Sequence, residues 1–106
     1  VAQAQETGVH YFDAELHRLR AEILLDQGGA MPEEVEDLLR RALEIAREQE
    51  AKWFELRAAT SLARLLRDQG RRDEARALLQ PVYEWFTEGF DTADLKGARA
   101  LLDELP

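Results

Sequence analysis

Apolar and polar residues alternate along this chain with the period of an α-helix. Apolar side chains recur at spacings of three and four over five stretches, which is typical of helices that bury one face. Glycines at Gly28-Gly29, Gly70 and Gly89 separate several of these stretches, because glycine reaches left-handed conformations at little cost. The predicted helices cover residues 11–27, 32–49, 52–69, 73–86 and 91–105.

The same spacing predicts which side of each helix is buried. In the first helix, Leu16, Leu19, Ile23 and Leu24 form a single apolar stripe. Trp53 opens the stripe of the third helix. The connections between helices are short, so consecutive helices should pack as antiparallel neighbours.

The chain also resembles itself. The segment 24–28, Leu-Leu-Asp-Gln-Gly, returns as Leu-Arg-Asp-Gln-Gly at 66–70, a displacement of 42 residues. Leu38-Leu39 returns as Leu78-Leu79, displaced by 40. Repeats of this size, each a pair of helices, indicate a solenoid in which stacked units share one core.

Composition narrows the class of protein. The 106 residues suffice for one domain, and 17 Leu and 16 Ala against 10 Val, Ile and Thr favour helices over strands. The net charge of −8 argues against a nucleic-acid binder, and no apolar run approaches the ~20 residues that span a bilayer. The absence of Cys excludes disulfides and thiol catalysis and fits a cytoplasmic location.

Catalytic and metal-binding patterns are scarce. The single serine, Ser61, lies on a predicted helix without a nucleophile elbow. His10 and His17 could share a helix face with Asp13 between them, but the sequence has no His-Glu-x-x-His motif. We therefore expect no enzyme activity, no metal and no cofactor.

Aromatic residues gather near predicted helix ends and turns. We expect them to wedge neighbouring helices together, so that truncating a buried one to Ala would cost ~3–5 kcal/mol, and Trp85→Ala would lower the melting temperature. Pro81 lies inside the fourth predicted helix, removes one backbone hydrogen bond and should kink it. The aromatic set consists of Trp53, Phe54, Trp85, Phe86 and Phe90.

The second half of the chain carries leucine, small and glycine residues at fixed spacings. They are Leu62-Ala63, Leu66, Gly70, Asp73-Glu74-Ala75 and Leu78-Leu79. This pattern resembles a tetratricopeptide repeat, in which a Leu and a small residue lie in the first helix, a Gly in the turn, and a small residue near the start of the second helix.

Two further segments, residues 14–20 and 83–95, resemble the C-terminal end of bacterial predicted ATPases. Those proteins often carry an adenylate-cyclase or winged-helix domain upstream. The resemblance implies that this chain is the C-terminal interaction or sensor segment of a larger protein.

The resemblance implies an all-α superhelix of the tetratricopeptide kind. Two helix-turn-helix units would cover residues 11–49 and 52–88, and a capping helix would cover 91–105, together a single domain. In such arrays the first helix of each unit lines a concave groove, which could hold a peptide carboxylate or an acidic segment. The candidate groove residues are Arg18, Glu22, Arg57, Ser61, Arg64 and Arg67.

A second interpretation of the same charges is ordinary ion pairing along a helix. Arg18 with Glu22, and Arg64 with Asp68, are both separated by four residues. Each such pair would stabilise its helix by only ~0.2–0.5 kcal/mol.

Two functions remain open from the sequence. The first is a scaffold that binds a protein or peptide partner, or other domains of its parent chain, through the groove or an exposed end. The second is a sensor domain that relays ligand occupancy to an upstream ATPase or cyclase; a sizeable apolar pocket would favour it.

The first helix should also leave an apolar edge at Tyr11, Phe12 and Leu16. An uncovered edge of this kind seeks a partner. We therefore expect self-association, as a two-fold dimer or by exchange of a helix pair.

Overall fold

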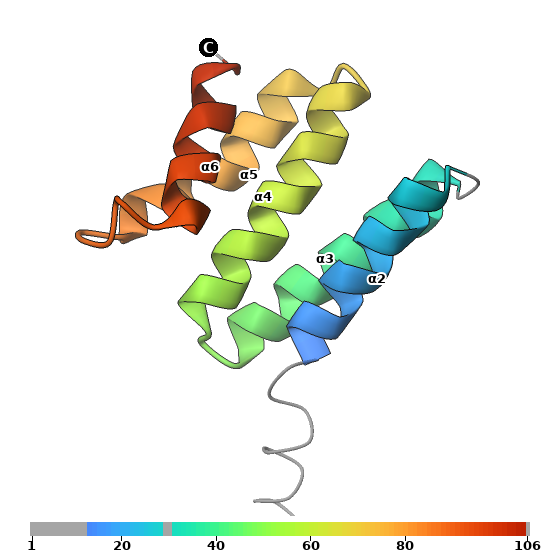
Figure 1. Ribbon diagram of the computed structural model, residues 1–106, viewed down its shortest axis with the longest axis horizontal. Coiled ribbons are helices and arrows are strands. Elements are labelled where there is room, and N and C mark those ends of the chain that lie inside the picture. Colours follow the sequence, from blue (N-terminus) through green and yellow to red (C-terminus); the bar gives the residue numbers. More distant parts are fainter. Residues whose placement is uncertain (1–12, 29–30, 106) are drawn as a thin grey trace, which may run out of the picture.

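The computed structural model describes residues 13–28 and 31–105, which form five α-helices and no strand (Figure 1). The predicted all-α fold with five helices is confirmed. The predicted helix start at residue 11, and with it His10, lies outside the described residues. The helices are α2 (Asp13–Gln27), α3 (Pro32–Glu48), α4 (Lys52–Asp68), α5 (Arg72–Trp85) and α6 (Ala93–Asp103).

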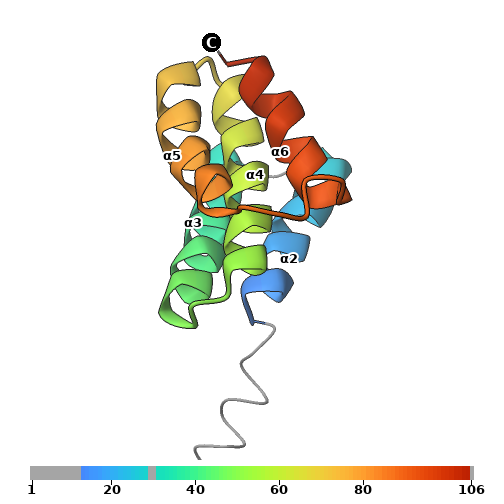
Figure 2. The same ribbon diagram turned by 90° about the vertical axis from the view of Figure 1, so that its left-hand side faces the viewer.

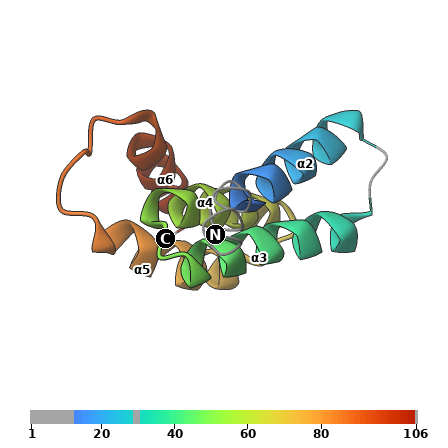
Figure 3. The same ribbon diagram turned by 90° about the horizontal axis from the view of Figure 1, so that it is seen from below.

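The other four helices are arranged around α4. Figure 2 shows α3 and α5 on one side of α4, with α2 and α6 on the other. Seen from below, α2 and α6 rise on either side of α4 (Figure 3). Because α4 packs against α2, α3, α5 and α6, successive helix pairs stack side by side, as in a helical-repeat superhelix.

The core is centred on α4. Ten of its 17 residues are buried, and Leu56, Leu62 and Leu66 are almost wholly inaccessible. Its buried polar groups are satisfied: for example, the Glu55 carboxylate accepts hydrogen bonds from Arg47 at 3.2 Å and Lys52 at 3.3 Å. Full satisfaction matters because an unpaired polar group in this interior would cost about 1–3 kcal/mol.

In α2 the buried side differs from the predicted stripe. Ala14 and Ala21 face the core, whereas Leu16, Leu19 and Ile23 are exposed. The exposure of Leu16 agrees with the apolar edge predicted for the first helix, whereas the prediction of a buried stripe was wrong for Leu19 and Ile23. The alanines leave room for α3 and α4 to approach α2 closely, so the large side chains lie on the side that no described helix covers.

Two turns confirm that a glycine follows the first helix of each predicted unit. Gly28 after α2 and Gly70 after α4 both have a left-handed backbone, with φ of 73° and 81°. A residue with a Cβ would be strained there, which explains why glycine ends the first helix of both units.

Three of the five aromatic residues form a cluster, in which one is buried and two cover it. Phe86, directly after α5, is buried, and its ring lies 4.6 Å from that of Trp53 and 5.1 Å from that of Trp85. Trp53 and Trp85 themselves are exposed, so the prediction that Trp53 is buried was wrong. α5 continues through Pro81 to this cluster.

The last helix belongs to the repeat as well. Its buried residues Leu95, Ala98 and Leu101, and Leu105 just after it, stand 39 positions after Leu56, Ala59, Leu62 and Leu66, with the same residue types in the same order. α6 packs on α4 and α5 as α4 packs on α2 and α3. α6 is thus the first helix of a third unit. It is capped at its N-terminus by Thr92, whose hydroxyl oxygen accepts a hydrogen bond from the Leu95 amide.

Phe86 and Trp85 provide a test of this packing. Phe86→Ala should lower the free energy of unfolding by about 3–5 kcal/mol, because it opens a cavity between α4 and α5. Trp85→Ala should cost about half as much or less, since that side chain is already half in water. Urea unfolding followed by circular dichroism measures both, and equal losses would contradict the burial described here.

Candidate binding groove

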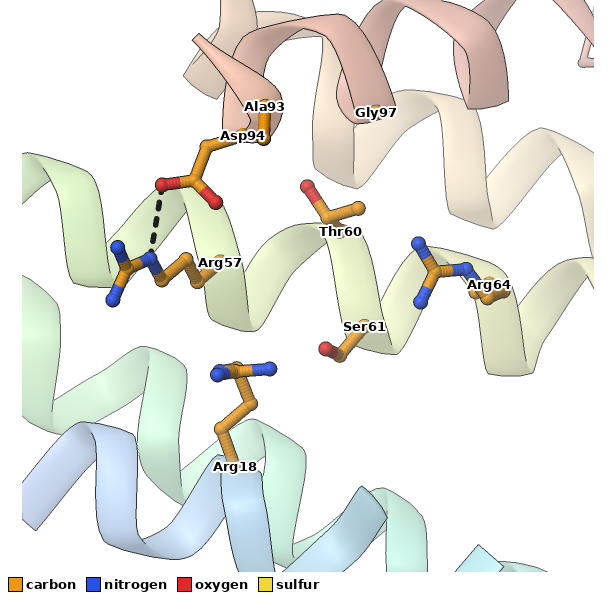
Figure 4. A pocket seen from close by; sticks show the side chains of 8 residues that line it. All are labelled: Arg18, Arg57, Thr60, Ser61, Arg64, Ala93, Asp94 and Gly97. Atoms are coloured by element: carbon orange, nitrogen blue, oxygen red, sulfur yellow. Dashed lines mark hydrogen bonds and ion pairs between the residues drawn. The ribbon is translucent and has the colours of Figure 1, made fainter. Parts of the chain in front are cut away.

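A hollow of about 250 Å³ lies on the concave side of the molecule, between α2 and α6 and above α4 (Figure 4). Side chains from all three helices reach it. Arg57, Thr60, Ser61 and Arg64 come from α4, which forms the floor. The residues that line it are Arg18, Arg57, Thr60, Ser61, Arg64, Ala93, Asp94 and Gly97.

The floor carries two hydroxyl groups that already donate hydrogen bonds. Thr60 Oγ1 donates to the Leu56 carbonyl at 2.8 Å, within the same helix. Ser61 Oγ donates to Glu22 Oε2 of α2 at 2.9 Å. Each hydroxyl oxygen keeps lone pairs that can accept a bond from a ligand.

Arg57 of α4 connects this helix with α2 and α6, the first helices of the neighbouring units. Its Nε donates to Asp94 of α6 at 2.9 Å, and its Nη1 donates to Glu15 of α2 at 3.1 Å. The hydrogen bond to Asp94 is the largest influence on its ionisation; together with the charge of Glu15 it outweighs partial burial and raises the pKa of Arg57. Arg57 is thus fixed between two carboxylates.

Glu15 is held by two arginines. Arg18 donates to it at 2.8 Å and 3.1 Å, which is a bidentate pair, and Arg57 approaches from α4. Partial burial opposes ionisation of Glu15, but the hydrogen bonds and positive charges of Arg18 and then Arg57 prevail and lower its pKa. The carboxylate therefore stays charged through mildly acidic conditions.

Arg64 is the least engaged of the three groove arginines. Its nearest carboxylate is Glu22, at 4.0 Å, and that carboxylate also receives Ser61 and lies 3.8 Å from Arg18. The Arg64 side chain is 48% exposed. In Figure 4 its guanidinium stands beside the floor hydroxyls. It can accept a further anion without leaving an existing close partner.

The structure thus places five of the six candidate residues around one hollow. Arg18, Arg57, Ser61 and Arg64 line it, and Glu22 bonds to Ser61 at its edge. Arg67 lies apart, because its guanidinium is bound to Glu104 of α6 at 2.8 Å and to Asp68 at 3.1 Å.

The expected pairs along single helices are found only in part. Arg18 and Glu22 approach to 3.8 Å, as predicted. Asp68 pairs with its neighbour Arg67, so the predicted pair of Arg64 with Asp68 was wrong. Arg64 instead approaches Glu22 of α2, at 4.0 Å.

Sequence reasoning missed three participants, Glu15, Asp94 and Gly97. For Glu15 a signal existed: it stands 42 residues before Arg57, the same displacement as the repeated Leu-x-Asp-Gln-Gly segment. Equivalent positions on stacked first helices therefore carry opposite charges. Asp94 and Gly97 gave no such signal. The residues of α6 stand 39 positions after their equivalents in α4, whereas those of α4 stand 42 positions after their equivalents in α2.

Within residues 13–28 and 31–105, no group of three His, Asp or Glu side chains is arranged to hold a metal ion. His17 Nδ1 lies 2.8 Å from the Asp13 carbonyl oxygen, one turn earlier in the same helix. None of the described helices has both the length and the hydrophobicity required to cross a bilayer.

Comparison with known proteins gives no relative: no family model, no curated protein and no solved structure matches the chain.

Acid titration tests the network around Glu15. Because its pKa is lowered in the folded state, the stabilisation is present above the ordinary value of 4.5 and is lost as the pH falls through the folded pKa. Glu15→Gln should therefore lower the free energy of unfolding by about 1 kcal/mol at neutral pH, and the difference from wild type should vanish in acid.

Urea unfolding at a series of pH values measures this difference. Glu88→Gln, which removes an exposed carboxylate in the loop after α5, is the control. If the free energies of unfolding of wild type and Glu15→Gln differed by the same amount down to the lowest pH, the role given to the Glu15 carboxylate would be contradicted.

Proposed function

We propose that this protein is an interaction scaffold of the tetratricopeptide kind, which binds an extended peptide segment of a partner in its concave groove through one peptide carboxylate. The observation that carries the proposal is Arg64, a half-exposed guanidinium beside two floor hydroxyls with its nearest carboxylate 4.0 Å away. A partner carboxylate placed there would gain a charge-assisted hydrogen bond that Glu22 does not fully supply.

The other charged groups of the groove, which are already paired, favour a peptide that fits the groove over an arbitrary anion. Arg57 and Arg18 are already bound to Glu15 and Asp94, so the groove presents alternating charges rather than a uniform basic surface. An extended peptide that carries one carboxylate among neutral residues fits this pattern. A highly acidic segment would meet Asp94 and Glu22 as well.

A ligand-sensing role has less support. A small-molecule sensor needs an enclosed, mostly apolar cavity with a few polar groups. The hollow above α4 is open and is lined chiefly by arginine, hydroxyl and carboxylate side chains. Scaffolding in the cytoplasm, on behalf of a partner or of other domains of a parent chain, agrees better with this lining and with a sequence that has no cysteine.

Peptide binding tests the proposal directly. An array of synthetic acidic peptides should contain binders, and isothermal calorimetry should show that Arg64→Ala weakens them about tenfold or more. Arg41→Ala, which removes an exposed arginine paired with Glu44 on α3, is the matched control and should change nothing. Binders that are indifferent to Arg64→Ala would reject the groove, and an array without binders would reject the function.

Gly97 allows the groove to be blocked without damage to the fold. A Cβ built at this position meets no atom within 4 Å, and Gly97 lies inside α6, so Gly97→Gln should stabilise the helix by up to about 0.5–1 kcal/mol. The same side chain should fill the hollow and weaken peptide binding. Increased thermal stability combined with unchanged affinity would show that the peptide lies elsewhere.

A further inference from the structure

One carboxylate oxygen of Glu22 lies among the hydrogen-bond donors of the groove. This atom, Oε2, accepts the hydrogen bond from Ser61 at 2.9 Å and lies 3.8 Å from Nη1 of Arg18 and 4.0 Å from Nη1 of Arg64. In Figure 4 the Ser61 hydroxyl stands between the guanidinium groups of the two arginines. A hydroxyl and two guanidinium groups thus surround one carboxylate oxygen, which is the set of donors that a peptide carboxylate would use.

The internal repeat relates this contact to a tighter one. The displacement of 42 residues maps Glu15 onto Arg57 and Glu22 onto Arg64, so two carboxylates of α2 face their equivalents on α4. The pair of Glu15 and Arg57 is closed by a hydrogen bond of 3.1 Å. The pair of Glu22 and Arg64 is open at 4.0 Å. Two equivalent pairs of one stack therefore differ in strength, and the weaker pair is the one that a ligand can replace.

The third helix of the groove, α6, explains why Arg64 differs from the other arginines of α4. Arg57 and Arg67 each bind a carboxylate of α6 that stands 37 positions later in the chain. The residue 37 positions after Arg64 is Leu101, which is buried and carries no charge. Among the described residues, the carboxylate within 4.0 Å of Arg64 is that of Glu22. The charge of Arg64 is therefore balanced from α2 and not from α6.

We propose that Glu22 is a built-in competitor, which holds the position of the ligand carboxylate in the free protein and is displaced when a peptide carboxylate binds to Arg64. This inference rests on the function proposed above and deepens it. Two carboxylates at one position repel each other, so one of them has to leave. Glu22 can leave, because its side chain is 32% exposed and its contacts with Arg18 and Arg64 are longer than hydrogen bonds.

Displacement makes Glu22 a determinant of specificity. When Glu22 leaves, the Ser61 hydroxyl can rotate and donate to the peptide carboxylate instead. The peptide then gains only the difference between its own contacts and those that Glu22 gives up. An anion that is poorly placed gains nothing, so the groove selects peptides whose other residues hold the carboxylate against Arg64.

Glu22→Gln tests the competition by calorimetry with the peptides that bind the wild-type chain. Gln keeps an oxygen that can accept the hydrogen bond from Ser61 but removes the charge, so peptide affinity should rise about fivefold. Asp26→Asn is the matched control, because it makes the same change of net charge at an exposed carboxylate one turn later on α2. It should change the affinity less than twofold. Circular dichroism should show that both variants keep the helical content of the wild type.

Combining Glu22→Gln with Arg64→Ala separates competition from a general effect of charge. If Glu22 competes for Arg64, its removal should raise peptide affinity clearly less in the Arg64→Ala background than in the wild type. An equal gain in the two backgrounds would overturn the proposal. Equal gains from Glu22→Gln and Asp26→Asn would also overturn it, since the position of the carboxylate would then not matter.

Acetate is a probe of the same contact that needs no peptide. In a titration with sodium acetate, referred to sodium chloride at the same ionic strength, the Nε–H resonance of Arg64 should shift at about fivefold lower acetate concentration in Glu22→Gln than in the wild type. That result would support the competition even if no peptide bound. Identical acetate titrations would overturn it. Peptides that need Arg64 but bind wild type and Glu22→Gln equally would overturn the competition alone and leave the scaffold function in place.

Discussion

The fold depends on the burial of α4 by the four helices that pack around it, α2, α3, α5 and α6. A single helical hairpin leaves one face of its apolar residues in water, and only a neighbouring pair can cover it. Leu56, Leu62 and Leu66 of α4 are inaccessible because α3, α5 and the flanking first helices enclose them together. Alanines such as Ala21 and Ala63 let these helices approach closely, so the core of a small chain becomes continuous through shared contacts.

The same stacking places arginines of α4 beside carboxylates of α2 and α6 on the concave side. Arg57, Arg64 and Arg67 follow one another along α4, and each turns toward carboxylates on α2 or α6. Arg57 and Arg67 connect helices through close ion pairs, whereas Arg64 has only a distant partner in Glu22. In the function proposed above, stability and recognition would draw on neighbouring side chains of one helix, and Arg64 is the arginine at which a ligand would gain most.

The two ends of the stack are not alike. On the other side of α4 from α2, α6 turns Lys96, Arg99 and Asp103 toward solvent. At the other end α2 presents leucine and isoleucine. These apolar residues stand at positions that are buried in the equivalent helix α4, but no described helix covers them on α2. The outer face of α2 is therefore apolar, in contrast to the polar groove.

The sequence by itself determined the five helices, the glycine turns and the pairing of helices into units, because these depend on contacts within three or four residues and on short loops. It could not determine which side of α2 is buried, since Ala14 and Ala21 follow a helical period as well as Leu16 and Leu19 do. The space left by α3 and α4 decided that. Tertiary structure also brought Asp94 beside Arg57 and removed Arg67 from the groove, because contacts across 37 residues depend on how far each helix pair is rotated on the next.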